Sequence, residues 1–131
     1  MNNGYDTTLI SGPTNLEPPR NVKLIKINSA DQMFKQTINS LPVDVAIFSA
    51  AVSDFKVVKI SKNKIKKTDS VSLRMIKNKD ILDYVSKHNS LRPKLVIGFS
   101  AETENIEANS LSKLNEKNCD WIIANDVSIR I

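Results

Sequence analysis

The sequence predicts an α/β fold, a Rossmann-like three-layer fold with a mostly parallel central sheet. Short apolar runs have the length of strands and recur at residues 7–10, 22–27, 45–48, 95–99 and 121–124. Amphipathic stretches with helical spacing lie between several of these runs, at residues 30–41, 80–85 and 105–118. Because the connections are short, each strand–helix–strand unit should be a right-handed crossover between parallel strands. With 131 residues, we expect one domain, residues 1–131.

The composition is that of a globular protein with a basic surface. Hydrophobic residues make up 40% and charged residues 25%, and the net charge of +5 favours anionic partners, whether phosphorylated small molecules or nucleic acid. Aromatic residues are only 5%, fewer than expected of a single-strand binder. Cys119 is the only cysteine, which excludes an internal disulfide and makes a reducing, cytoplasmic setting the default expectation. No apolar run approaches the ~20 residues of a membrane span.

The first part of the chain predicts two strands. Asn2 to Gly4 have the composition of a helix C-terminus, although no helix precedes them. The strand at 7–10 runs into the turn Ser11-Gly12-Pro13, and the mixed composition of 22–27 places that strand near the sheet edge.

A helix and the central strand follow. Ser29 and Gln32 form a possible capping box, and Pro42 ends the helix. Val45–Phe48 lacks the period-two alternation of a half-exposed strand, so we expect a central strand covered on both faces. Small residues at 49–51 then stand at its carboxyl end, where open α/β sheets bind ligands.

The loop after this strand is the first candidate site. Asp54 is followed by a series of cations that suits a polyphosphate and its magnesium ion, although an ordinary solvated basic loop has the same pattern. The cations are Lys56, Lys59, Lys62, Lys64, Lys66 and Lys67. Gly4, Gly12 and Gly98 are the only glycines, so neither a dinucleotide fingerprint nor a Walker loop is present.

Further candidates lie beyond it. Val71–Ile76 alternates like a strand, and Asn78 or Asp80 can begin the next helix, whose N-terminus would be either an anion site or an ordinary cap. Phe99, at the end of its strand, is either a core residue or a lid on a planar ring.

The last helix and strand complete the prediction. The helix 105–118 is expected to turn Ile106, Leu111 and Leu114 inward, and Lys113 and Lys117 share one face of it. A buried thiol is expected at Cys119, and a surface position at His88.

Taken together, these residues resemble the bacterial, CTP-using phosphopantothenoylcysteine synthetase family of coenzyme A biosynthesis over nearly the whole chain. The blocks that carry the resemblance are residues 11–13 (SGP), 49–55 (SAAVSDF), 64–67 (KIKK), 77–81 (KNKDI), 98–103 (GFSAET) and 124–128 (ANDVS). The resemblance implies a Rossmann-like fold, a cytoplasmic ligase that joins 4'-phosphopantothenate to cysteine through an acyl cytidylate, Mg²⁺ bound with CTP, and a homodimer. Lys64 is the implied catalytic residue. The implied nucleotide contacts are Asp54, Lys64, Asn78, Lys79, Asp80, Ile81, Phe99, Lys113 and Lys117.

Departures from the family pattern bear on activity. Lys79 replaces the family's usual proline, and the family's first strand, glycine-rich turn, asparagine-bearing loop and first helix are absent. The segment after Asn125-Asp126 is short, ending at Ile131. We therefore expect weak CTP binding and little or no activity alone, unless a separate chain supplies the strand and loop. The alternatives are a non-catalytic interaction subunit and, less favoured, a basic nucleic-acid-binding domain.

Overall fold

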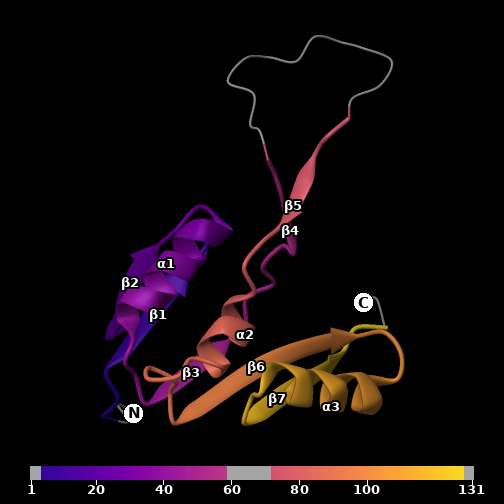
Figure 1. Cartoon of the computed structure of the whole chain (residues 1–131). Coiled ribbons are helices and arrows are strands. Elements are labelled where there is room, and N and C mark those ends of the chain that lie inside the picture. Colours follow the sequence, from indigo (N-terminus) through magenta and orange to yellow (C-terminus); the bar gives the residue numbers. More distant parts are fainter. Residues whose placement is uncertain (1–3, 59–71, 129–131) are drawn as a thin grey trace.

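The structure is a computed structural model that describes residues 4–58 and 72–128 (Figure 1). Its strands are β1 (Thr7–Ser11), β2 (Val22–Lys26), β3 (Val45–Phe48), β4 (Phe55–Val57), β5 (Met75–Lys77), β6 (Leu95–Glu102) and β7 (Trp121–Asp126). Its helices are α1 (Ala30–Ser40), α2 (Ile81–Ser86) and α3 (Ile106–Lys117).

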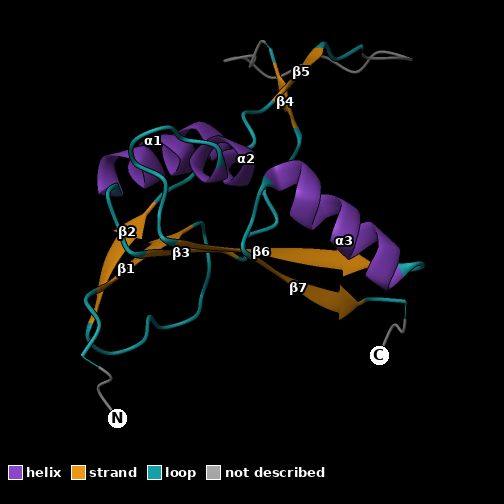
Figure 2. Ribbon diagram, turned by 60° about the horizontal axis from the view of Figure 1, so that its bottom comes forward, coloured by secondary structure: helices purple, strands orange, loops and turns teal. Residues whose placement is uncertain are grey.

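The strands are mostly parallel, as predicted. β1 pairs with β2, and β6 lies between β3 and β7, with all of these pairs parallel. β4 and β5 form a separate antiparallel pair that projects from the rest of the molecule (Figure 1). The helices α1, α2 and α3 all lie on one side of the parallel strands (Figure 2). This part of the chain thus supplies two of the three expected layers.

The start of α1 confirms the capping signal read from the sequence. The hydroxyl of Ser29 accepts a hydrogen bond from the amide of Gln32 at 3.2 Å. The side-chain oxygen of Gln32 reaches back to the amide of Asn28 at 2.7 Å, one residue before the position that a standard capping box would use. One amide of the first helical turn, that of Gln32, and the amide of Asn28 just before the helix are therefore satisfied.

The core lies where α2 and α3 pack on β6. Val85 and Val96 are fully buried, and Ile81 is 6% exposed. A methyl group at Gly98 would come within 2.8 Å of Ile122 Cδ1 and 2.9 Å of Leu82 Cδ2. Gly98 therefore lets a helix approach the middle of β6 closely, and it does not mark the end of that strand.

Arg92 ties the carboxyl ends of two helices to the sheet. Its guanidinium donates to the carbonyls of Ser86 at 2.7 Å, Pro93 at 2.9 Å and Asn118 at 3.0 Å, and to the carboxylate of Asp120 at 3.1 Å. Asp120 also accepts from the amide of Val96 at 2.6 Å. This network fixes the ends of α2 and α3 against the start of β6.

Some expectations were wrong in detail. β3 is not covered on both faces, because Val45 is 44% exposed and Ile47 is 61% exposed. Leu111 is 51% exposed, since the face of α3 that packs on the sheet runs through Ser110 and Leu114. The sequence did not predict β4, and the strand expected at 71–76 is shorter and antiparallel, with residue 71 outside the described part. Asn2 and Asn3 also lie outside it, while Gly4 has the left-handed φ of 73°.

Candidate functional site

An ion pair joins the start of α2 to the last turn of α3. The ammonium of Lys117 lies 3.1 Å from Asp80 Oδ2 and 3.0 Å from Glu116 Oε1. The Lys117 side chain is only 18% exposed, whereas those of Asp80 and Glu116 are 39% and 67% exposed. Asp80 is therefore the better-shielded partner.

The pKa shifts follow from these contacts. Hydrogen bonds to Glu116 and Asp80 raise the pKa of Lys117 above its usual value. Partial burial pushes the pKa of Asp80 upward, but the amide of Asp83 together with Lys117 and Lys113 outweighs burial, so that this pKa lies below its usual value. At neutral pH the Asp80 carboxylate is therefore ionised and paired with Lys117, and the positive charge of Lys113 favours the same state.

Lys113 brings a second cation to the same region. Its ammonium donates to the carbonyl of Phe99 on β6 at 2.8 Å, which holds the side chain along the sheet. The ring of Phe99 is half-buried. Because an ammonium has three donors, Lys113 keeps further donors for an anion.

Asn78 connects this region to the β4–β5 pair. Its amide donates to the carbonyl of Asp54 at 2.7 Å, and its side-chain nitrogen donates to the carbonyl of Ser53 at 2.7 Å. Its side-chain oxygen is buried and has no hydrogen-bond partner among the described residues. Such an acceptor is costly to leave unpaired and suits a hydroxyl or amine of a ligand.

Lys79 and Ile81 are turned away from the cations. Lys79 Nζ lies 4.6 Å from the centroid of the Phe34 ring, and that ring makes an edge contact with Tyr84. Ile81 is part of the core at 6% exposure. Only the backbone groups of Lys79 and Ile81 lie near Asp80, because both residues are its neighbours in the sequence and their side chains point elsewhere.

Of the two interpretations of the α2 N-terminus, the ordinary cap is confirmed. Asp80 Oδ1 accepts from the amide of Asp83 at 2.9 Å, so the helix provides its own anionic cap. The cations of α3, rather than α2 amides, are what an anion would meet here.

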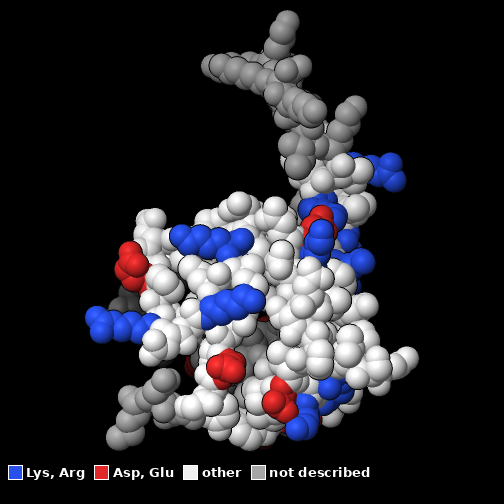
Figure 3. Space-filling view, turned by 90° about the vertical axis from the view of Figure 1, so that its left-hand side faces the viewer, with Lys and Arg blue, Asp and Glu red and all other residues white. Residues whose placement is uncertain are grey.

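Most of the basic loop lies outside the described residues. Lys59, Lys62, Lys64, Lys66 and Lys67 all fall there, so the structure says nothing of the implied catalytic residue. Lys56 is described, and its ammonium pairs with Asp31 of α1 at 2.6 Å. On the face in Figure 3, basic side chains gather near the foot of the β4–β5 pair.

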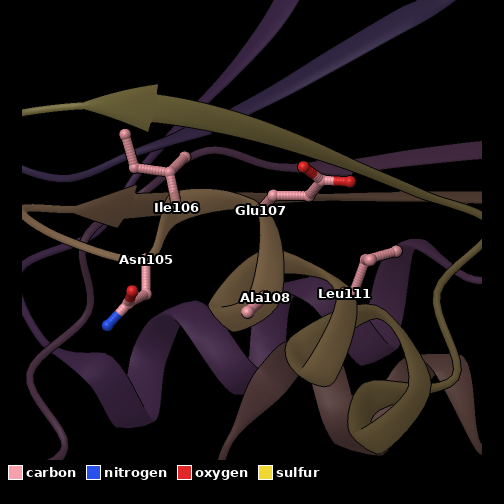
Figure 4. Close-up of a pocket in the computed structure, with 5 residues that line it drawn as sticks. All are labelled: Asn105, Ile106, Glu107, Ala108 and Leu111. Carbon is pink, nitrogen blue, oxygen red and sulfur yellow. The ribbon is translucent and has the colours of Figure 1, made fainter.

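Sequence reasoning did not find the hollows along α3. One hollow of about 430 Å³ is lined by Asn105, Ile106, Glu107, Ala108 and Leu111 (Figure 4). Its neighbour, about 420 Å³, extends between α3 and β7 and includes Ser110, whose hydroxyl has no partner within the described part of the chain. The sequence carried no signal for these hollows, because Leu111, which lines both, was expected to point inward. None of the predicted nucleotide contacts lines either hollow.

Neither Cys119 nor His88 has the setting of a catalytic group. Cys119 is half-buried rather than fully buried as expected, and this partial burial raises the pKa of its thiol. His88 is half-buried rather than a simple surface residue, because its Nδ1 accepts from the amide of Leu91 at 3.1 Å. No helix among the residues described is long and apolar enough to cross a membrane.

Comparison with known proteins gives consistent matches. The family model described as the DNA/pantothenate metabolism flavoprotein C-terminal domain matches residues 1–130. Proteins called "Coenzyme A biosynthesis bifunctional protein CoaBC" are similar: that of Haemophilus influenzae is 42% identical over 127 residues, and that of Borreliella burgdorferi is 39% identical over 128. Each match covers 95% of this chain, and 32% and 33% of the respective relative. The chain thus spans about a third of the length of the curated relatives it matches.

Solved structures agree with the sequence matches. The C-terminal domain of a coenzyme A biosynthesis bifunctional protein CoaBC superposes with a TM-score of 0.76 at 35% identity, covering 91% of this chain and 55% of that one. A DNA/pantothenate metabolism flavoprotein from Streptococcus pneumoniae gives a TM-score of 0.75 at 26% identity, covering 95% and 66%. These likenesses confirm the α/β fold with its mostly parallel sheet. The chain therefore belongs to the family of the DNA/pantothenate metabolism flavoprotein C-terminal domain.

Proposed function

We propose that this chain forms the nucleotide-binding part of a phosphopantothenate–cysteine ligase in the coenzyme A pathway. The family match supports the pathway, because the curated relatives are coenzyme A biosynthesis proteins. The observation that carries the proposal is the linked arrangement of Asp80, Lys117, Lys113 and Phe99 at the junction of α2, α3 and β6. Residues far apart in the sequence there provide cations beside the middle of β6, level with the carboxyl end of the neighbouring parallel strand β3, whose Phe48 is the register partner of Gly98. Such folds bind ligands at the carboxyl ends of parallel strands.

The proposed chemistry has two steps. A carboxylate oxygen of 4'-phosphopantothenate attacks the α-phosphorus of CTP, and the bond to the β-phosphate breaks, which releases pyrophosphate and leaves an acyl cytidylate. The amine of cysteine then attacks the acyl carbon, the bond to the phosphate oxygen breaks, and CMP leaves as the nitrogen loses a proton. Both steps build charge on phosphate oxygens, and fixed cations aimed at that charge lower the barrier.

The described cations have distinct roles in this proposal. Lys113 and Lys117 bind phosphate oxygens, while Asp80 holds Lys117 in place and Asn78 offers its unpaired side-chain oxygen to the nucleotide. Lys64 acts on the acyl cytidylate step. Asp54, Phe99 and the backbone of Lys79 and Ile81 complete the nucleotide contacts.

Magnesium would be bound chiefly through the nucleotide. Within residues 4–58 and 72–128, no group of three or more histidine, cysteine, aspartate or glutamate side chains could hold a metal ion. Mg²⁺ keeps several waters and is commonly held by substrate phosphates with one or two carboxylates, so the absence of a dedicated cage fits this use. Of the two carboxylates beside Lys117, Asp80 is the better shielded, at 39% exposure against 67% for Glu116.

Weak binding and low activity are part of the proposal. The chain alone binds CTP or CMP weakly in the cytoplasm, and the full reaction requires a separate polypeptide that provides a further strand and an asparagine-bearing loop. Dimerisation through the sheet accompanies full activity.

Titration calorimetry with CTP and Mg²⁺ tests the binding claim. We expect weak binding that falls at least about 10-fold in Lys113→Ala, since a charge-assisted hydrogen bond is worth about 1.5–3 kcal/mol. The control is Lys94→Ala, because Lys94 pairs with Asp44 in an open setting, with side chains 86% and 80% exposed. Equal weakening in both variants, or displacement of CTP by generic duplex DNA, would favour a non-specific basic surface instead.

Pyrophosphate release tests the catalytic claim. The assay is run with 4'-phosphopantothenate and CTP, with and without an added amino-terminal segment. Release only with the segment supports a split enzyme, whereas no release in either case supports a non-catalytic interaction subunit.

A further inference from the structure

We propose that helix α1 positions the nucleotide site, with Asp31 and Phe34 as its positioning residues. Neither residue is a predicted nucleotide contact. The role rests on the proposed nucleotide-binding function, because α1 holds the two segments that carry Asp54 and Asn78. Two contacts support it, and each joins α1 to a residue beside one of these predicted nucleotide contacts.

The first contact is an ion pair at the start of β4. The ammonium of Lys56 lies 2.7 Å from Oδ1 and 2.6 Å from Oδ2 of Asp31, so both carboxylate oxygens engage it. Lys56 follows Asp54 by two positions in the chain, and Asp31 lies in the first turn of α1. The pair therefore holds the foot of β4, and with it Asp54, against one end of α1.

The second contact is a cation–π interaction at the start of α2. Lys79 Nζ lies 4.6 Å from the centroid of the Phe34 ring, within the range of about 6 Å for such contacts. The Phe34 ring is half-buried and makes an edge contact with Tyr84, with 4.9 Å between the centroids, so packing fixes its direction. Because Lys79 follows Asn78 directly, α1 also holds the segment that carries Asn78.

Both contacts come from one face of α1 and reach segments that are joined to each other. Asp31 and Phe34 are three positions apart, so they are neighbours on the helix surface. Figure 2 shows α1 and α2 on the side of the sheet from which the β4–β5 pair projects. The amide of Asn78 donates to the carbonyl of Asp54 at 2.7 Å, and its side-chain nitrogen donates to the carbonyl of Ser53 at 2.7 Å. The two segments thus form one unit, which α1 holds at two points.

The position of this unit matters for the nucleotide. The side-chain oxygen of Asn78 is buried and has no hydrogen-bond partner among the described residues. Its direction follows from the backbone at Asn78 and from the hydrogen bond to Ser53. A displacement of a binding group by about 1 Å is enough to lose much of its effect. Loosening the α1 contacts should therefore weaken nucleotide binding, although every group that touches the nucleotide is still present.

Charge reversal at Asp31 tests this role in the full chain. Binding of CTP with Mg²⁺ is followed by NMR titration of the labelled protein. The side chains of Lys56 and Asp31 are 38% and 64% exposed, so water screens the pair. Asp31→Lys replaces attraction by repulsion at the foot of β4 and should weaken CTP binding roughly 3- to 10-fold. Long-range attraction predicts the opposite direction, because the variant adds positive charge to a protein that binds an anion.

The double charge swap provides the rescue. Asp31→Lys combined with Lys56→Asp restores an ion pair and the net charge of the parent chain, so the CTP affinity should return to within about 2-fold. The Tm should remain lowered, because a lysine in the first turn of α1 opposes the helix dipole whichever partner it has. A merely structural role would instead move the affinity and the Tm together.

Asp44→Lys is the matched control for the reversal. Asp44 pairs with Lys94 at 2.8 Å in an open setting, and the substitution changes the net charge by the same amount as Asp31→Lys. It should leave CTP binding at least as tight as in the parent chain.

The aromatic contact is tested with conservative variants. Phe34→Leu keeps an apolar side chain but removes the ring face, and it should weaken CTP binding roughly 2- to 5-fold. Phe34→Tyr keeps the ring and should bind as the parent does. In the chain without nucleotide, the NMR signals of the Lys79 methylene groups should carry a ring-current shift from Phe34. If α1 holds one unit at two points, this shift should shrink in Asp31→Lys and return in the double swap.

The outcomes separate this role from the nucleotide proposal. CTP binding that is unchanged or tighter in Asp31→Lys, or that the double swap does not restore, would overturn the positioning role and leave the nucleotide proposal standing. Equal weakening in Asp44→Lys would overturn it as well. Absence of CTP binding by the parent chain would overturn the nucleotide proposal and this role with it.

Discussion

Replacing Lys117 by methionine is the sharpest test of the site. Methionine keeps an apolar stem of similar length and removes only the charge that lies 3.1 Å from Asp80. Because the Asp80 side chain is 39% exposed, water screens the pair, and its contribution to the free energy of unfolding should be only about 0.5–1 kcal/mol. The expected fall in Tm is roughly 2–4 °C.

The effect on nucleotide binding should be larger than the effect on stability. Lost hydrogen bonds from a charged donor to phosphate are worth about 1.5–3 kcal/mol, which corresponds to a CTP affinity roughly 10- to 150-fold weaker. Calorimetry at two salt concentrations should also show a shallower salt dependence for the variant, since one phosphate contact is lost.

Lys87→Met is the matched control. Lys87 pairs with Asp83 on α2 at 2.6 Å and is 47% exposed, so its loss removes a comparable ion pair away from the cluster. A double-mutant cycle of Lys117→Met with Asp80→Asn separates the pairing energy from the loss of phosphate contacts. If Lys117→Met binds CTP as tightly as the parent chain, the role given to this cation is wrong.

Three further predictions concern the hydrogen bonds of Arg92, the close packing at Gly98 and the pH dependence of stability. Arg92→Ala should lower the free energy of unfolding by about 3 kcal/mol in urea titrations, because it removes a charged donor from the Asp120 carboxylate and from three main-chain carbonyls. An effect below about 0.5 kcal/mol, the usual size of a surface substitution, would contradict this. Gly98→Ala should cost about 1–3 kcal/mol by overpacking, whereas Gly12→Ala, with its nearest atom 4.0 Å away, should be close to neutral. The pKa of Asp80 is lowered by folding, so its contribution is present above its unfolded value of about 3.9 and is lost as the pH falls through the folded value. The parent and Asp80→Asn should therefore differ in stability at pH 7 and converge near pH 2, and a constant difference would refute the assignment.

Local signals predicted much of the fold. The hydroxyl and amide at the start of α1 and the apolar runs of β1, β2, β3, β6 and β7 each act within a few residues, so the sequence shows them directly. β4 could not be predicted in this way, because three residues after Asp54 become a strand only by pairing with β5 across the intervening loop. The exposure of β3 was also missed, since a run of apolar residues does not say whether a neighbour is present.

The site was predictable only in part and for a similar reason. The resemblance supplied the positions of Lys113 and Lys117, and the helical spacing placed both on one face. Contacts to Phe99 and Asp80 orient the side chains of Lys113 and Lys117. These contacts join residues separated by 14 and 37 positions, which no local pattern encodes. The orientation of the Lys79 side chain toward the Phe34 ring likewise depends on the packing of α1 beside α2.

The hydrogen bonds of Arg92 show how such a network can tolerate mutations in evolution. Three of its four acceptors are carbonyl oxygens of the main chain, at Ser86, Pro93 and Asn118. Every amino acid carries that oxygen, so mutations at those positions would leave the acceptors in place. In a saturation screen, substitutions at position 92 itself should consequently be the least tolerated. The three residues that accept through their carbonyls should tolerate any side chain that allows the same main-chain conformation.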